Sequence, residues 1–209
     1  MDKVDLKVER KDLYAPPRGR FVEVVVPEMT FLAVDGHGDP NTSEDYRHAV
    51  EVLFTVSYAV KSVSRRELGR DHVVLPLEGL WSATDWTAFE RRATQDWSWT
   101  MLVRQPDWVA PALLDQARGS VRPERLPALA RLRVLTLVEG RCVQTLHVGS
   151  YDDEGPVLRA LHREHLPSHG LVPTGPHHEI YLSDPRRTAP GKLKTVLRQP
   201  VAEHPAASR

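Results

Sequence analysis

Short apolar segments rich in β-branched residues recur along the chain and predict most of its strands. The first two, Phe21–Val26 and Phe31–Val34, are separated by only four residues, which predicts a β-hairpin. Further strands are expected at Val73–Leu77 and Trp97–Val103, and the latter alternates between large apolar and smaller residues. The first half of the chain therefore contains two pairs of predicted strands.

A long amphipathic segment separates these two pairs. Apolar positions from Tyr46 to Ser57 recur every three or four residues, as on one face of a helix. Thr42 or Ser43 can cap this helix, which should run to about Arg66. The first half is thus predicted to be a strand-strand-helix-strand-strand unit.

The second half repeats this order after two short helical stretches, Ala110–Arg118 and Pro123–Ala130. The expected elements are strands at Leu132–Leu137 and Cys142–Gly149, a helix at Glu154–His165, and strands at Glu179–Leu182 and Leu193–Leu197. Both closing strands end in Arg-Gln-Pro, at 104–106 and 198–200. We interpret the two series as a duplication. Neither half could bury its apolar face well alone, so they should form one domain with a pseudo-twofold axis.

The predicted organisation has five parts. A polar arm covers residues 1–20, and a tail without periodicity covers residues 202–209. Between them lies one domain, 21–201, made of repeat 1 (about 21–109), linker helices (110–131) and repeat 2 (about 132–201). The fold class is α+β, with an antiparallel sheet, helices on one side and a central ligand cleft between the halves.

Charge and cysteine content narrow the functional classes. Lys plus Arg equals Asp plus Glu at 28 each, so the field that draws proteins onto nucleic acid or anionic lipid is missing. The N-terminus lacks the pattern of a signal peptide, and no apolar run approaches the ~20 residues that span a bilayer. The single cysteine, Cys142, lies in an apolar segment and should pack as a small hydrophobe. We expect a cytoplasmic protein without direct nucleic-acid or membrane partners.

Glu179 and Tyr181 are the first candidate pair for chemistry. They lie two apart on a predicted strand and therefore point to the same face. On a core face, Glu179 would be a costly buried charge, retained mainly for a purpose. On a solvent face, the pair would mean little.

Tryptophans form the second candidate group. Trp81, Trp97, Trp99 and Trp108 all fall late in the first half, and indole rings suit flat ligands and cations. Trp97 and Trp99 share one strand face, where plain core packing is an equal alternative. Trp81 follows a turn-like Glu78-Gly79-Leu80 and is the stronger candidate for a ligand wall.

Metal, cofactor and covalent chemistry lack support in the sequence. His162 and His165 do not have the i, i+4 separation of the helical zinc motif, and adjacent His177 and His178 have no accompanying ligand cluster. The Gly-x-Gly at 36–38 is too short for a phosphate loop, and no Gly-x-Ser-x-Gly elbow occurs. No metal and no cofactor are expected.

Four segments together resemble one known family: Pro76–Trp81, Arg104–Trp108, His147–Tyr151 and His177–Pro185. The chain resembles the stand-alone branch of the GyrI-like small-molecule-binding proteins over roughly residues 5–201. That resemblance implies two copies of a β-α-β-β module of the SHS2 type, the fold of effector-binding domains in AraC-type and MerR-type regulators. We expect no helix-turn-helix beside the domain, because the short arms cannot supply one, and this would set the chain apart from those regulators.

The resemblance also implies a site. A glutamate matching Glu179 lies at the bottom of an aromatic-walled pocket in multidrug-binding relatives and faces lipophilic, often cationic compounds. Trp81 and Trp108 would clamp the ligand, and the other expected contacts are Trp99, Tyr58, Glu78 and Tyr151. The predicted function is binding of bulky, flat, lipophilic small molecules, as a monomer or homodimer.

Two alternatives stay open. Some stand-alone relatives hydrolyse cyclopropane-bearing, DNA-alkylating natural products, which would make Glu179 the base that activates water and Tyr181 the donor to a developing oxyanion. The relative that names the family inhibits a topoisomerase, which would imply a protein-interaction role instead.

Overall fold

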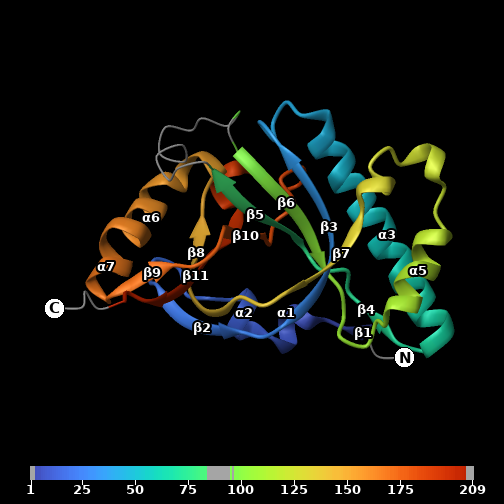
Figure 1. Ribbon diagram of the computed structural model, residues 1–209, viewed down its shortest axis with the longest axis horizontal. Helices are drawn as coiled ribbons and strands as arrows, with labels where there is room; N and C mark the ends of the chain where they lie inside the picture. The colour runs from blue at the N-terminus through green and yellow to red at the C-terminus, as the bar shows by residue number, and fades with distance from the viewer. Residues whose placement is uncertain (1–2, 84–94, 96, 206–209) are drawn as a thin grey trace.

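The computed structural model describes residues 3–83, 95 and 97–205, and confirms a mixed α+β fold (Figure 1). Its centre is a nine-stranded sheet in the order β2-β8-β11-β10-β5-β6-β3-β7, with β9 paired to β11. The strands are β2 (Val22–Val26), β3 (Met29–His37), β5 (Leu77–Ala83), β6 (Trp97–Arg104), β7 (Arg133–Leu137), β8 (Gly140–Val148), β9 (Leu171–Pro173), β10 (His177–Tyr181) and β11 (Lys194–Glu203). A separate parallel pair joins β1 (Lys3–Val4) to β4 (Asp71–His72).

The predicted hairpin at residues 21–34 is wrong. Among the described strands β2 pairs with β8, whereas β3 pairs with β6 and β7, so each half lends its first strand to the other half. The β2–β8 and β3–β7 ladders share one register across the bend at Pro27 and Glu28. In a hairpin, β2 would reverse and pair with β3. Pro27 lacks the N–H that such a ladder would use, and β3 instead continues in the direction of β2. The exchange makes the two halves one structural unit.

The long helix of the first half is confirmed. Helix α3 (Glu44–Leu68) begins where the Ser43 hydroxyl accepts the Tyr46 N–H at 3.2 Å, and it ends at Gly69 with a positive φ of 63°. Helix α5 (Pro111–Gly119) packs against it. The second linker helix expected at Pro123–Ala130 is instead two short 3₁₀ turns, η2 (Pro123–Arg125) and η3 (Leu129–Arg131).

The second half has a more broken helix. Its elements are η4 (Tyr151–Asp153), α6 (Gly155–Arg159), a π-helical turn η5 (Ala160–His165) and α7 (Leu166–Ser168), and a later turn η6 spans Pro190–Lys192. Leu161 and Leu166 pack on Val143 and Val201 of β8 and β11. Helix α3 packs on the same face of the sheet over β3, β5 and β6. The helices of both halves thus cover one face, as expected.

Across the described residues, no helix has both the length and the apolarity that a bilayer crossing requires.

The expectation of a loose arm at residues 1–20 is wrong. Helices α1 (Leu6–Glu9) and α2 (Lys11–Tyr14) cover the opposite face of the sheet, below it in Figure 1. Leu13 is fully buried there, and its carbonyl accepts a hydrogen bond from Arg198 at 2.7 Å. The polar sequence hides this because the apolar contacts are few and widely spaced. The tail also starts later than residue 202, since β11 continues to Glu203.

Leu13→Ala should lower the free energy of unfolding by about 2–5 kcal/mol, because it leaves a cavity between α2 and the sheet. Val8→Ala is the matched control: Val8 is 60% exposed on α1, and its loss should change stability by less than about 0.5 kcal/mol. Urea unfolding measures both. Equal, small effects would mean that the N-terminal segment is not part of the core.

Candidate functional site

The candidate site lies where β5 and β10 pair in the middle of the sheet. Their register places Glu179 opposite Gly79 and His177 opposite Trp81. Alternation along β10 directs Glu179 and Tyr181 to the helical face, and the Tyr181 hydroxyl donates to Oε2 of Glu179 at 2.7 Å. The Glu179 side chain is only 14% exposed. The prediction that these two residues share a face is confirmed, and that face is the core side of the sheet.

Trp81 completes a chain of hydrogen bonds. Its indole N–H donates to the Tyr181 hydroxyl at 2.9 Å, and that hydroxyl in turn donates to Glu179. Gly79 makes room for this contact, since a Cβ there would lie 2.8 Å from Nε1 of Trp81 and 3.2 Å from the Tyr181 oxygen. The glycine is therefore required by close approach, and the chain orients the carboxylate.

Aromatic rings from both halves surround this chain. Tyr151 of η4 packs edge-on to Tyr181 at 5.6 Å, and Trp97 packs edge-on to Trp81 at 5.6 Å. Tyr46 of α3 lies close enough to influence the ionisation of Tyr181. The site therefore lies between the two halves. Sequence reasoning left Tyr46 out of the site because its helical periodicity indicated only core packing.

Trp99 lies next to Trp81 on the same face of the sheet and packs in the core. It lies opposite Trp81 in the β5–β6 register, is 2% exposed, and packs edge-on to Tyr46 at 5.3 Å. Gly36 of β3 lies flat against it, because a Cβ at that position would come within 2.0 Å of the indole ring. Trp99 thus holds the neighbouring rings in place, and its burial agrees with the core alternative.

Burial controls the proton of Glu179. Removal from water raises the pKa of its carboxyl to about 7, against the opposing effects of the Tyr181 hydrogen bond and of His178. Burial and the nearby carboxylate raise the pKa of Tyr181 well above its usual value, and burial raises that of Tyr151 to about 12. Near neutral pH the site thus holds two hydroxyl donors and one carboxyl that can take or release a proton.

Glu78 does not belong to this site. It points to the opposite face of the sheet, where Nε2 of His178 lies 2.9 Å from its carboxylate. Nδ1 of His178 lies 3.0 Å from Glu139, which also contacts Arg198 at 3.4 Å. Burial disfavours the cation, but the two carboxylates prevail and raise the pKa of His178 to about 9. The expectation of Glu78 as a ligand contact is therefore wrong, because strand alternation places it behind the sheet.

Trp108 and Tyr58 also lie elsewhere. Trp108 donates to the Ser64 hydroxyl at 3.1 Å and carries the Arg70 guanidinium over its ring at 4.0 Å, near the end of α3. Ser64 is eighteen residues from Tyr46, roughly 27 Å along the helix. Tyr58 is 59% exposed. Trp81 and Trp108 are therefore too far apart to hold one small ligand between them, so the expectation of a clamp is wrong.

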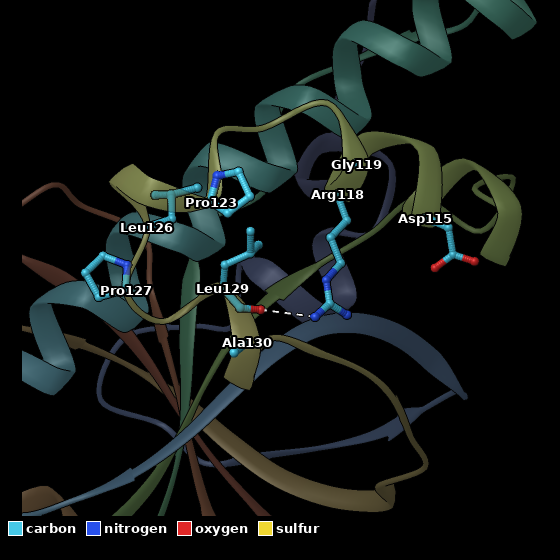
Figure 2. Close-up of a pocket in the computed structure, with 8 residues that line it drawn as sticks. All are labelled: Asp115, Arg118, Gly119, Pro123, Leu126, Pro127, Leu129 and Ala130. Atoms are coloured by element: carbon cyan, nitrogen blue, oxygen red, sulfur yellow. Dashed lines mark hydrogen bonds between the residues drawn. The ribbon is translucent and has the colours of Figure 1, made fainter.

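A separate open pocket of about 600 Å³ lies beside α5, η2 and η3 (Figure 2). Figure 2 shows the Arg118 guanidinium turned back toward the chain, donating to the Leu129 carbonyl at 3.2 Å. The pocket is lined by Asp115, Arg118, Gly119, Pro123, Leu126, Pro127, Leu129 and Ala130. None of these residues belongs to the Glu179 site. Among them, no set of side chains resembles the hydrogen-bonded chain of Trp81, Tyr181 and Glu179.

Glu179→Gln should change how stability depends on pH. In the unfolded chain the carboxyl ionises above its ordinary value of 4.5, but in the fold it keeps its proton up to about 7. The unfolded chain then binds fewer protons, so this group makes stability fall as pH rises between these values, by at most about 3 kcal/mol. The variant lacks that fall. Relative to the wild type, Glu179→Gln should gain stability between pH 5 and pH 8, as measured by urea unfolding.

Glu51→Gln, an exposed position on α3, is the control and should follow the wild type at both pH values. A Glu179→Gln curve parallel to the wild type would mean that the carboxyl is not desolvated.

Comparison with solved structures finds two proteins similar in sequence and one similar in fold alone. An uncharacterized conserved protein from Listeria innocua is 39% identical with a TM-score of 0.85, and the match covers 96% of this chain and 100% of that one. A hydrolase from Listeria innocua is 37% identical with a TM-score of 0.80 and the same coverage. The EcmrR C-terminal domain is 10% identical with a TM-score of 0.57, covering 88% of this chain and 98% of that one, and shows a shared fold.

No curated protein matches the sequence. A family model does match, the GyrI-like small molecule binding domain, over residues 21–202. This range contains the exchanged strands, the paired halves and every residue of the Glu179 site. The chain therefore belongs to the GyrI-like small-molecule-binding domain family.

Proposed function

We propose that this protein binds bulky, flat, lipophilic small molecules, including cations, between its two halves at Glu179. The observation that carries the proposal is the hydrogen-bonded chain from Trp81 through Tyr181 to Glu179, buried among aromatic rings. Membership of a small-molecule-binding family supports it. The aromatic rings and the carboxylate at the site indicate which ligands it would bind.

Apolar and aromatic surface would bind the ligand body, and the carboxylate would set its charge preference. Indole and phenol rings attract flat and cationic groups through their faces. A cation near Glu179 would lower the pKa of the carboxyl from about 7, because it favours the ionised form. Ligand binding and proton release are then coupled, so cations should bind more tightly at pH 8 than at pH 6.

Glu179→Gln should weaken binding of a cationic rhodamine dye at pH 8 by about tenfold or more, because the amide keeps the shape but removes the charge. Fluorescence anisotropy measures the affinity, and a neutral dye of similar size should lose little. Glu124→Gln, an exposed position in η2, is the matched control and should bind both dyes as the wild type does. Unchanged binding of the cation by Glu179→Gln would refute the site.

A second function, hydrolysis, is favoured by the pKa of Glu179 and by the 37% identical hydrolase. A carboxyl with a pKa near the working pH is a suitable general base. On a cyclopropane-bearing dienone, water would add to the ring methylene as the strained C–C bond breaks. The bonding pair would move to the dienone oxygen, which becomes a phenol on protonation, and Glu179 would take the proton from water. The Tyr181 hydroxyl would turn from Glu179 to donate its one hydrogen to the developing oxyanion.

If the protein is a hydrolase, it should open the cyclopropane ring of a duocarmycin-type compound and add one water molecule. Mass spectrometry measures the product. Glu179→Gln should lower the rate by at least about a hundredfold, since the base is lost. In the wild type the rate should rise with pH through about 7 as the base ionises. Dye binding without any turnover would leave the binding function alone.

A further inference from the structure

His177 lies beside Glu179 and Trp81 and takes no part in the interactions described so far. It is two residues before Glu179 on β10, so it points to the same face, and it lies opposite Trp81 on β5. Its side chain is 1% exposed. Within the described residues, neither of its ring nitrogens has a hydrogen-bond partner. Buried polar groups are rarely left so, and an unpaired one indicates a missing partner.

The position of that partner follows from the geometry. Nε2 of His177 lies 3.8 Å from Oε1 of Glu179, while Oε2 is already bound to Tyr181. This gap is too long for a direct hydrogen bond, but one water can lie within about 2.7–3.0 Å of both atoms. A carboxylate oxygen accepts from water, and a neutral imidazole nitrogen can accept as well. Water held this way donates both hydrogens and keeps its lone pairs free.

The surroundings keep His177 neutral. Burial lowers its pKa to about 3, and the nearby His162 and His178 act in the same direction, opposed by Glu139. His162, on the π-helical turn η5, is a titratable group that faces it from the helical layer, with ring centroids 6.5 Å apart. His178 and Glu139 act from the other face of the sheet. A neutral ring can accept a hydrogen bond at one nitrogen, which a protonated ring cannot.

We propose that His177 and Glu179 together hold one water molecule, which acts as the nucleophile of the proposed hydrolysis. The inference rests on that proposed function. In the step, the water oxygen forms the bond to the ring methylene and one of its protons passes to Oε1 of Glu179. The other hydrogen stays on the new hydroxyl and remains bonded to Nε2 of His177 until product leaves. His177 thus aims the water, and Glu179 is the base.

Two substitutions separate this role from packing. His177→Leu removes the acceptor and should lower kcat at least about tenfold with KM nearly unchanged, because the substrate's aromatic contacts remain. His177→Gln places an amide oxygen near the Nε2 position and should retain most of the activity. Wild-type kcat in His177→Leu, or equal losses in both variants, would overturn the proposal.

A high-resolution crystal structure tests the water without any turnover. We expect one water within hydrogen-bond distance of both His177 Nε2 and Glu179 Oε1 in the wild type, and none there in His177→Leu. If the wild type holds this water but opens no cyclopropane ring, the hydrolysis fails while the water site stands. A wild-type site without the water refutes the role of His177, even where turnover is found.

Discussion

A buried ion cluster behind the central strands is the constraint on which the rest of this structure depends. His178 lies between the carboxylates of Glu78 and Glu139, and Arg198 joins the second of these. The four residues come from β5, the bend between β7 and β8, β10 and β11, so the cluster joins both halves. Breaking one buried pair of this kind costs about 3–5 kcal/mol, because the remaining charge is left without its partner. The cluster therefore resists any shift of register between β5 and β10.

The register has a direct consequence on the other face. With His178 held behind the sheet, its neighbours His177 and Glu179 must point forward, between the helices of the two halves. There Glu179 meets Tyr181 and Trp81 and loses most of its water, which is why its pKa rises while that of Glu139 falls to about 2. Burial acts on both carboxyls, but two cations compensate Glu139 and a phenol is the main partner of Glu179. One strand thus carries a structural charge on one face and a titratable one on the other.

Local patterns were informative where local interactions decide the structure. The helix at α3, its Ser43 cap and the shared face of Glu179 and Tyr181 follow from spacing alone. The hairpin failed because β2 pairs with β8 and β3 with β6 and β7, all far away in the sequence, and apolar alternation says nothing about which strand lies alongside. The loose arm failed for a similar reason, since Leu13 is buried only because a distant sheet face covers it.

By itself, the sequence determined most of the helices and strands, the family, and the pairing of a carboxylate with a phenol on one strand. These depend on periods of two and of 3.6 residues and on motifs a few residues long. Only the tertiary structure decided which aromatics join that pair. It brought Trp81, Tyr46 and Tyr151 to Glu179 and placed Trp108, Tyr58 and Glu78 elsewhere. The reason is physical: membership of a site depends on strand register and on position along a helix, and long-range packing sets both.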